Sequence, residues 1–422
     1  MEVREKIVII GGGFAGLQLA KKLNNRNKKI IVIDRVNHHM FQPLFYQVAS
    51  GRIEPSNISF PFRKIFQDSK NIRYRMTEVV KIVPEENKII TATDATEFTY
   101  DKLIIATGCK TNFFGNAGME ALTFGMKNTQ EAIAIRNHVL LTFEKLILER
   151  KRSDDGNWNI VIVGSGPTGV ELAGAFAEMK KEILPRDYPH MNFEELNIIL
   201  ISSTEKPLAV MSKESQQMSE KYLKDLGVQF LSDEFVTGYD GDCVVMKSGK
   251  SIPSNNVIWA AGVTGNVIDG LNPEIMVRNR YKTDRFNRVL GYDNIFAIGD
   301  IAYMETPKYP LGHPQVANVA IHQGKVLGSN LLKKPGKIWD EYEYNDLGSM
   351  ATIGKYRAVV DLPKFKFQGF FAWYFWMFLH LMLILSVRNK LAVFFNWMWS
   401  YLNKDSSLRL IIIPNRKNST EQ

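Results

Sequence analysis

Runs of consecutive apolar residues that lead into glycine recur along the chain. The first run covers residues 6–10 and continues into Gly11-Gly12-Gly13-Phe14-Ala15-Gly16. Residues 17–23 then follow a helical pattern, and a second apolar run at residues 30–33 ends in Asp34. Uninterrupted apolar runs are typical of parallel strands that are buried on both faces. The pattern therefore predicts a strand, a glycine turn, a helix and a second strand.

The same arrangement returns in the middle of the chain. Residues 159–163 lead into Gly164-Ser165-Gly166-Pro167-Thr168-Gly169, residues 170–177 are predicted as a helix, and residues 196–201 as the next strand. Two further strands are predicted where apolar runs end in Ala106-Thr107-Gly108 and in Gly299-Asp300. The pattern predicts an α/β protein with two Rossmann-like dinucleotide-binding domains.

Both glycine turns have the spacing GxGxxG, which has a physical reason at each position. The first glycine permits a tight turn, the second lets the backbone approach a pyrophosphate, and the third lets helix and strand pack closely. The helix N-terminus binds the phosphates through its free N–H groups and its dipole. Asp34 can accept hydrogen bonds from both hydroxyls of a ribose. A glycine-rich turn without a ligand is the weaker interpretation, because the strand, glycines, helix, strand and acid occur together.

Two such sites in one chain indicate two different nucleotides. The simplest pairing is FAD with a nicotinamide nucleotide, so that a hydride passes between them.

The C-terminal part of the chain is its most apolar segment. Residues 370–387 contain one His and one Ser among apolar residues, residues 388–390 interrupt the run, and residues 391–402 are again mostly apolar. Aromatic rings beside Lys and Arg are typical of a membrane interface. Five of the seven tryptophans lie here or just upstream, at Trp339, Trp373, Trp376, Trp397 and Trp399.

Three interpretations of this segment compete: a buried core helix, a single transmembrane span, and a monotopic anchor of two helices in one leaflet. The apolar run barely reaches the length of a span, which is about 18 residues or more. It also contains His380 and is followed by a second, shorter amphipathic element. We therefore favour the anchor, in which amphipathic helices attach the protein to the bilayer surface through residues 364–404.

Composition and charge exclude several classes of protein and partner. Hydrophobic residues make up 45% and charged residues 23% of the 422 residues, which excludes a disordered or low-complexity chain. The net charge is +9, and residues 364–422 carry eight bases against two acids. We expect no nucleic-acid partner, because these bases lie among Trp and Phe.

Cys109 and Cys243 cannot form a disulfide framework or a CxxC motif. The N-terminal apolar run is too short for a signal peptide, and no metal site is expected.

Two segments resemble the type II NADH dehydrogenases, which are non-proton-pumping NADH:quinone oxidoreductases of the two-dinucleotide-binding-domain flavoprotein superfamily. Residues 38–49, HHMFQPLFYQVA, are similar to the family's FQPLLYQVA, and residues 259–263, WAAGV, to its WTAGV. The resemblance extends from residue 6 to about residue 412 and includes a closing strand at 409–411. It implies that NADH passes a hydride to the flavin N5 and that the flavin reduces a membrane quinone.

The resemblance also implies the domain organisation. An FAD-binding domain is split into residues 1–112 and 280–345, an NAD(P)H-binding domain at 113–279 is inserted in it, and residues 346–422 form a membrane-anchoring domain. The protein is then expected to be a peripheral homodimer on the cytoplasmic face of the cell inner membrane.

Functional positions carry over by the same resemblance. Glu171 matches an acidic residue near the nicotinamide and the flavin, and Lys355 a lysine beside the isoalloxazine ring. The alternatives are a carboxylate favoured by the helix dipole and a solvated loop lysine. The expected cofactor-binding residues are Gly11, Gly13, Gly16, Asp34, Thr107, Gly108 and Asp300 for FAD, and Gly164, Gly166 and Gly169 for NADH. Ala317 and Gly262 are also expected to bind a cofactor.

The chain departs from the family at two places. Where the family has AQxAxQ at the quinone entrance, this chain has Ala317-Asn318-Val319-Ala320-Ile321-His322 followed by Gln323. Asn318 and His322 can still donate to a quinone carbonyl, with Gln323 and Gln315 as further candidates. The strand at 196–201 is followed by Ser202 rather than by an acid, which removes the usual rejection of a 2′-phosphate.

Two other functions remain open. A sulfide:quinone reductase uses the same frame but needs reactive cysteines beside the flavin, and this chain has only two cysteines. A redox-responsive NADH-binding flavoprotein would serve in signalling rather than in turnover.

Overall fold

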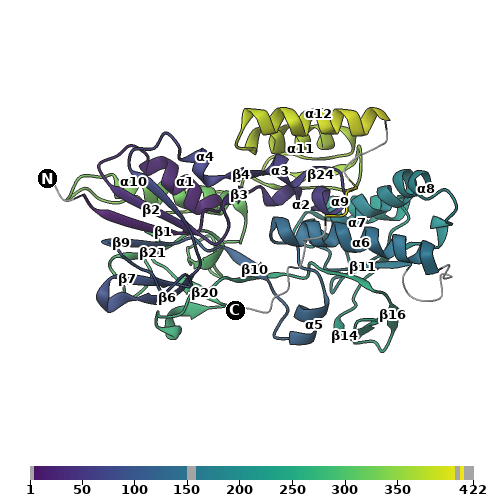
Figure 1. The fold of residues 1–422 in the computed structure, drawn as a ribbon, viewed down its shortest axis with the longest axis horizontal. Helices are drawn as coiled ribbons and strands as arrows, with labels where there is room; N and C mark the ends of the chain where they lie inside the picture. The colour runs from purple at the N-terminus through teal and green to yellow at the C-terminus, as the bar shows by residue number, and fades with distance from the viewer. Residues whose placement is uncertain (1–3, 150–157, 404–408, 413–422) are drawn as a thin grey trace. The chain divides into compact units, whose positions relative to one another are not determined.

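The computed structural model describes residues 4–149, 158–403 and 409–412 (Figure 1). Contacts divide the chain into two compact units. Unit 1 comprises Met1–Met40, Ser59–Lys110 and Val263–Leu347, and unit 2 comprises Phe41–Ile58, Thr111–Gly262 and Gly348–Gln422. The predicted domain limits stay a prediction, because the units are defined by contacts and not by what they bind.

Unit 1 is built on a parallel sheet of five strands in the order β21-β9-β1-β2-β5. The expected apolar runs form its strands, so the α/β prediction is confirmed for this unit. The strands are β1 (Lys6–Ile10), β2 (Lys29–Asp34), β5 (Ile72–Met76), β9 (Lys102–Ile105) and β21 (Ile295–Ala297).

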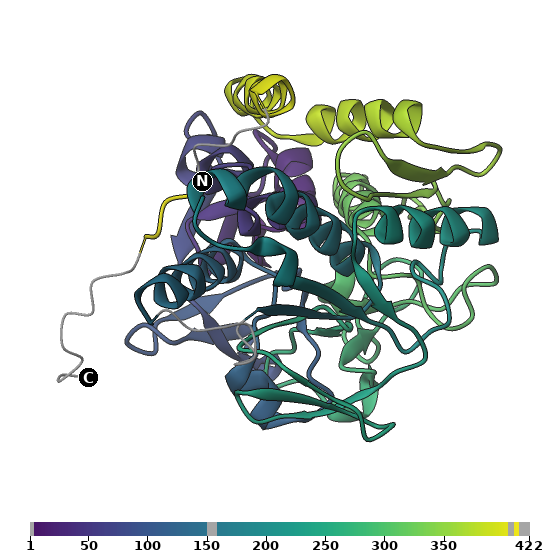
Figure 2. The ribbon, with the colours of Figure 1, turned by 90° about the vertical axis from the view of Figure 1, so that its right-hand side faces the viewer.

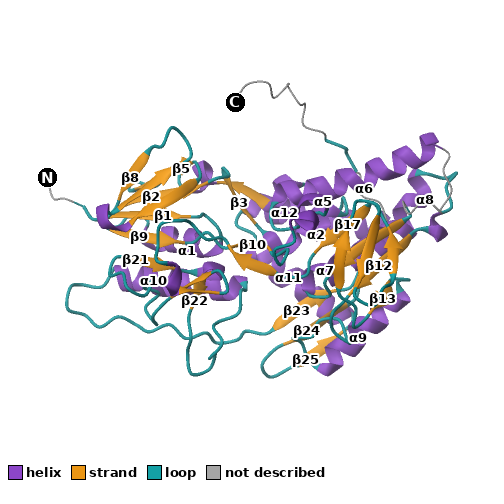
Figure 3. Cartoon of the chain, turned by 90° about the horizontal axis from the view of Figure 1, so that it is seen from below, coloured by secondary structure: helices purple, strands orange, loops and turns teal. Residues whose placement is uncertain are grey.

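Helices α1 (Phe14–Leu23) and α10 (Ala317–Leu331) pack against each other in unit 1 (Figure 3). A glycine makes this close approach possible: a Cβ on Gly324 would lie 2.5 Å from the Ala15 carbonyl oxygen. Unit 1 also contains an antiparallel sheet of β6 (Val79–Val83), β7 (Lys88–Thr91) and β8 (Glu97–Thr99).

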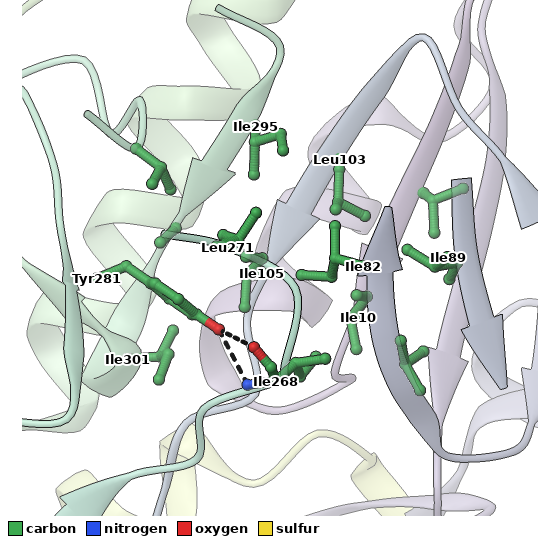
Figure 4. Packing of buried hydrophobic residues seen from close by; sticks show 14 of the residues in the cluster. Ile10, Ile82, Ile89, Leu103, Ile105, Ile268, Leu271, Tyr281, Ile295 and Ile301 are labelled. Carbon is green, nitrogen blue, oxygen red and sulfur yellow. Dashed lines mark hydrogen bonds between the residues drawn. The ribbon is translucent and has the colours of Figure 1, made fainter. Parts of the chain in front are cut away.

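The buried core of unit 1 lies between these sheets and the residues around Tyr281 (Figure 4). Tyr281 is fully buried, and its hydroxyl donates to the Ile268 carbonyl at 2.7 Å and accepts from the Ile268 N–H at 2.9 Å. The phenol therefore fixes a loop without leaving a buried polar group unpaired.

Unit 2 is also built on a parallel sheet, with four strands in the order β13-β12-β11-β17. Helix α7 (Pro167–Glu178) follows β11 directly, and the longer helix α6 (Thr129–Glu149) precedes it in the chain. The strands are β11 (Asn159–Val163), β12 (Asn197–Ile201), β13 (Gln229–Leu231) and β17 (Asn256–Trp259).

The last part of unit 2 is an antiparallel sheet of β23 (Ser349–Thr352), β24 (Ala358–Asp361) and β25 (Lys366–Gln368), followed by two helices. These are α11 (Phe370–Leu383) and α12 (Val387–Asn403), drawn in yellow-green in Figures 1 and 2. Within the described ranges, no helix is both long and apolar enough to cross a bilayer.

The structure adds one detail of this region that the sequence pattern did not specify and corrects another. Residues 388–390 do not separate the helices but form the first turn of α12, where the Lys390 N–H donates to the Ser386 carbonyl at 2.8 Å. The expected strand at 409–411 is wrong, since residues 409–412 form no strand and Ile412 instead accepts a hydrogen bond from the Asn137 side chain at 2.7 Å. The bases Lys404, Arg416 and Lys417 lie outside the described residues.

Candidate active site

The first glycine turn connects β1 to α1 in unit 1. Gly11 has a φ of +102°, and a Cβ there would lie 2.2 Å from the Ala106 carbonyl oxygen. A Cβ on Gly16 would lie 1.9 Å from the Gly11 carbonyl oxygen. In contrast, a Cβ on Gly13 would meet no protein atom within 4 Å. Packing therefore explains two of the glycines, while the third exposes the backbone at the start of a helix, as a pyrophosphate requires.

The second turn, in unit 2, has the same geometry. Gly164 has a φ of +109°, and its Cβ would lie 2.4 Å from the Ala260 carbonyl oxygen. A Cβ on Gly169 would lie 1.8 Å from the Gly164 carbonyl oxygen, whereas one on Gly166 would again meet nothing within 4 Å. Both turns thus fit a dinucleotide in the same way. Ala260 belongs to the predicted segment 259–263, whose Gly262 has a φ of +149°.

Asp34 is placed at the end of β2, beside the first turn. Its Oδ2 accepts from the Gly12 N–H at 2.7 Å and its Oδ1 from the Val36 N–H at 3.0 Å. Burial raises the pKa of this carboxyl, and the two N–H donors oppose that shift. Each carboxylate oxygen keeps a lone pair for a ribose hydroxyl, so Asp34 fits its predicted role.

His39 is a supporting residue that the sequence did not reveal. Its ring is 3% exposed, its Nδ1 lies 3.0 Å from the Gly12 carbonyl oxygen, and it makes an edge contact with Phe14 at 5.3 Å between ring centroids. Burial lowers the pKa of His39 to about 4, so the ring is neutral at pH 7. A neutral ring can hold the first glycine turn without adding charge beside it. The pair His38-His39 was visible in the sequence, but its partner Gly12 was not.

The remaining predicted FAD residues gather at the ends of β9 and β21. The Thr107 hydroxyl donates to the Asn266 carbonyl at 2.7 Å, and the Cys109 thiol donates to Asp300 Oδ2 at 2.9 Å. Gly108 has a φ of +68°, and a Cβ there would meet nothing within 4 Å. Unit 1 therefore brings the first glycine turn, Asp34, Thr107, Gly108 and Asp300 to the carboxyl ends of its parallel strands, where such sheets bind ligands.

The predicted quinone residues lie on α10, which begins at Ala317. Asn318 and His322 are half-buried and four residues apart, so they share one face of the helix. Burial lowers the pKa of His322, and nearby Lys325 acts in the same direction. Gln323 is 1% exposed, and its Oε1 accepts from the Gly299 N–H at 2.7 Å. Its amide oxygen therefore holds the backbone next to Asp300.

Glu171 is buried in α7, with 8% of its surface exposed. Its Oε1 lies 3.4 Å from the Thr352 backbone nitrogen, which donates to it. Burial raises the pKa of Glu171 to about 8, and the Thr352 N–H opposes that shift. A carboxyl with this pKa can gain or lose a proton near neutral pH, which suits acid–base work.

Lys355 lies in the turn after β23, and its side chain is 8% exposed. Its Nζ pairs with Glu182 at 2.8 Å and donates to the Ser400 carbonyl at 3.2 Å. Its backbone N–H donates to Glu178, whose carboxylate also pairs with Arg52. The alternative of a solvated loop lysine does not agree with this burial. Its role beside a flavin stays a prediction.

Ser202 follows β12 at the position where an acid was expected. It is 2% exposed, and its Oγ lies 2.6 Å from Ser165 Oγ and 2.9 Å from Thr204 Oγ1. The hydroxyl is thus engaged with two protein hydroxyls. No carboxylate occupies this position to repel a 2′-phosphate.

Two family models match most of the chain. The model described as pyridine nucleotide-disulphide oxidoreductase matches residues 5–324, and the model described as NDH2 C-terminal domain matches residues 347–404.

Curated relatives agree with these models. The chain is 31% identical to type II NADH:quinone oxidoreductase Ndh of Mycobacterium tuberculosis, over 95% of this chain and 89% of that protein. It is 26% identical to type II NADH:quinone oxidoreductase of Staphylococcus aureus, over 84% and 89% of the two chains.

The fold is shared with solved structures. NDH2 from Plasmodium falciparum in complex with NADH aligns with a TM-score of 0.90 at 20% identity, over 97% of this chain and 100% of that chain. The sulfide:quinone oxidoreductase of Aquifex aeolicus aligns with a TM-score of 0.71, also at 20% identity, over 95% and 96% of the two chains. The protein therefore belongs to the pyridine nucleotide-disulphide oxidoreductase family and, within it, to the type II NADH:quinone oxidoreductases.

Proposed function

We infer that the protein oxidises NADH and reduces a membrane quinone through bound FAD, as a membrane-associated respiratory enzyme that pumps no protons. The relatives that match most of its length are named for NADH:quinone oxidoreduction. FAD supplies the redox chemistry when bound, because it can accept a hydride and pass on two electrons. We place FAD in the predicted domain of residues 1–112 and 280–345, and NADH in residues 113–279.

One observation carries this proposal: the same open glycine occurs in two separate turns. Gly13 and Gly166 each leave room for a ligand group where a Cβ would meet nothing within 4 Å. Each also stands at the N-terminus of a helix that follows a buried parallel strand. Two cradles in one chain fit a bound dinucleotide cofactor and a dinucleotide substrate.

We assign the proton chemistry to Glu171, with Lys355 as a second catalytic residue. The carboxyl of Glu171 can hold or release a proton near neutral pH, since its pKa is raised to about 8 by burial. Lys355 is held by Glu182 and by the Ser400 carbonyl, so its ammonium is fixed rather than free to sample solvent. Both groups belong to unit 2.

We assign the quinone contacts to Asn318 and His322 on α10. Both side chains can donate to a carbonyl oxygen. Because Gln323 is engaged by Gly299, we expect its contribution to be smaller than theirs.

We propose that α11 and α12 attach the protein to the bilayer surface. Phe371 is 80% exposed and Trp399 is 61% exposed, and the cations Arg388 and Lys390 lie at the start of α12. Exposed aromatic residues beside cations favour the headgroup region. Other exposed apolar side chains of the two helices are Phe370, Tyr374, Phe378, Met382, Leu383, Val387, Leu391, Phe394, Phe395 and Met398.

The cytoplasmic face and the homodimer are further proposals, based on the family resemblance. Protease protection in oriented membrane vesicles tests the face, and sedimentation in mild detergent tests the dimer.

Steady-state kinetics test the proposed function. Purified protein with NADH should consume NADH at a rate that depends on a short-chain quinone, and Glu171→Gln should lower kcat. Oxidation of sulfide in place of NADH would support the sulfide:quinone reductase. Slow oxidation of one equivalent of NADH, without a quinone-dependent rate, would support a signalling flavoprotein.

Vesicle binding tests the membrane proposal. Phe371→Glu should weaken binding to vesicles that contain anionic lipid. Phe235→Glu is a matched control, because Phe235 is 56% exposed but lies between β13 and β14. Equal binding of both variants and the parent protein would contradict attachment through α11 and α12.

A further inference from the structure

Five buried residues of unit 2 form a continuous hydrogen-bonded chain between α12 and Glu171. The Trp397 Nε1–H donates to Gln47 Oε1 at 2.7 Å, and Gln47 Nε2 donates to the Tyr46 hydroxyl at 2.8 Å. The Tyr46 hydroxyl lies 3.0 Å from Thr352 Oγ1, and the Thr352 N–H donates to Glu171. All five residues are at most 8% exposed. Tyr46 and Gln47 belong to α2 (Phe45–Ala49), in the segment that resembles the family motif.

The chain of bonds has a fixed direction. An indole nitrogen can only donate, so Trp397 orients the Gln47 amide with its oxygen towards α12 and its NH₂ towards Tyr46. The Tyr46 oxygen therefore accepts from Gln47. Its own hydrogen would be buried and unpaired unless it points to Thr352 Oγ1, and an unpaired buried donor is costly. Trp397 on α12 thus determines how the Thr352 hydroxyl is oriented.

Thr352 is the last residue of β23 and connects this chain to Glu171. Its hydroxyl accepts from Tyr46 while its backbone N–H donates to the Glu171 carboxylate. The side chain is 3% exposed, so neither bond can be replaced by bulk water. Fixing the hydroxyl fixes the residue, and with it the N–H that stabilises the ionised form of Glu171.

We propose that Tyr46, Gln47 and Trp397 are positioning residues that hold the Thr352 donor against Glu171, so that the seating of helix α12 sets the protonation of Glu171. This inference rests on the proposed catalytic role of Glu171. It gives a function to the motif residues Tyr46 and Gln47 that the nucleotide sites do not use.

The charged groups nearby do not supply an alternative. Arg52 pairs with Glu178, Lys355 pairs with Glu182 at 2.8 Å, and Arg357 pairs with Asp225 at 3.7 Å. Burial raises the pKa of Tyr46, and the negative charge of ionised Glu171 acts in the same direction. The titratable and charged groups around this chain of bonds include Tyr46, Arg52, Glu178, Glu182, Asp225, Lys355, Tyr356, Arg357 and Tyr401. Of the groups that act on the pKa of Glu171 besides burial, the Thr352 N–H is the one that the structure identifies.

Helix α12 has two faces that suit this arrangement. Trp397 is 3% exposed and points into the hydrogen-bonded chain, whereas Trp399 is 61% exposed. Contact of the exposed face with lipid would hold α12 in place and so keep Trp397 hydrogen-bonded to Gln47. The membrane segment and the proton site would then be coupled within one unit.

The pH dependence of quinone-dependent NADH oxidation tests the proposal on the full-length holoenzyme. The limb of the kcat profile that Glu171→Gln abolishes is first assigned to Glu171. Tyr46→Phe and Trp397→Phe should each move the midpoint of that limb upward by about half to one pH unit, the size expected for one hydrogen bond. The double variant should move it no further than the larger single shift, because both changes break one chain.

Three further substitutions separate positioning from general damage. Thr352→Val should move the limb in the same way, while Thr352→Ser, which keeps the hydroxyl, should restore it. Tyr281→Phe removes an equally buried phenol in unit 1 and should lower stability without moving the limb.

Three outcomes would overturn the proposal. The limb could stay in place in Tyr46→Phe, the two single shifts could add in the double variant, or Tyr281→Phe could move the limb as far as Tyr46→Phe. If Glu171→Gln leaves every limb in place, the catalytic role of Glu171 fails as well. Loss of the limb in Glu171→Gln with no shift in Tyr46→Phe would overturn the positioning chain alone.

Discussion

The substitution Gly166→Ala separates a ligand-binding glycine from a packing glycine. Gly166 has φ −68° and ψ 179°, which alanine adopts without strain, and its Cβ would meet no protein atom within 4 Å. The folded protein should therefore be as stable as the parent or more stable by about 0.4–1 kcal/mol, because alanine restricts the unfolded chain. The added methyl would instead occupy the space that we assign to the pyrophosphate of NADH.

Gly166→Ala should instead weaken the binding of NADH. Inserting a methyl into a filled site costs about 1–3 kcal/mol, which corresponds to a weakening of about 5- to 150-fold. The KM for NADH should rise in that range while the FAD content stays constant. Gly169→Ala is the control, because its Cβ would lie 1.8 Å from the Gly164 carbonyl oxygen and must force the helix and the turn apart.

Thermal unfolding and steady-state kinetics on both variants are the assay. Gly169→Ala should lower the Tm by about 2–10 °C, whereas Gly166→Ala should not. If Gly166→Ala lowers the Tm as much as Gly169→Ala, or leaves the KM for NADH within about twofold of the parent, the open glycine is not where the phosphates bind.

Four further outcomes are expected. Gly13→Ala should lower the flavin content of purified protein without unfolding it, and full retention of flavin would contradict the FAD turn. The parent should accept NADPH. Ser202→Glu should reduce kcat/KM for NADPH relative to NADH by about tenfold or more, since like charges in contact cost several kcal/mol. An unchanged ratio would show that Ser202 does not lie in the adenosine site. Arg52→Met should lower the free energy of unfolding by about 3–5 kcal/mol, because it leaves the buried Glu178 carboxylate without its counter-ion. Lys206→Met, in a partly exposed pair, should cost about 1 kcal/mol or less, and equal losses in denaturant titrations would refute the burial argument. Burial raises the pKa of Glu171 to about 8, above its value in the unfolded chain, so the folded state binds this proton more tightly. The free energy of unfolding should therefore fall as pH rises from about 4.5 towards 8. Glu171→Gln should flatten that dependence in denaturant titrations, and an unaltered slope would contradict the prediction.

The parallel strands and glycine turns could be predicted from the sequence because their determinants are local. An apolar run of five residues with glycines at fixed spacing has few other structures available. β1 (Lys6–Ile10) and β11 (Asn159–Val163) accordingly lie where the pattern placed them.

Contacts between distant residues were not accessible in this way. His39 holds Gly12 from 27 residues away, and Trp397 reaches Gln47 across 350 residues. Nothing in the local sequence around Gln47 indicates a partner on the C-terminal helix. The burial that raises the pKa of Glu171 is likewise a result of packing, and a helix N-terminal carboxylate looks the same in sequence.

The sequence pattern did not show where α12 begins, because residues 388–390 interrupt the apolar run. Arg388 and Lys390 are tolerated in its first turn, since Lys390 extends back and donates to the Met382 carbonyl at 2.8 Å, at the end of α11. Long basic side chains can satisfy the last carbonyls of a helix, and the sequence pattern does not show which helix end they reach.

The absorbance spectrum of the purified protein, recorded alone, after NADH and then after a short-chain quinone, tests the central claim most directly. The protein should be yellow with the bands of an oxidised flavin, lose that colour when NADH is added without oxygen, and regain it when the quinone follows. A colourless protein that releases no flavin on denaturation would contradict it, as would a flavin that NADH does not bleach.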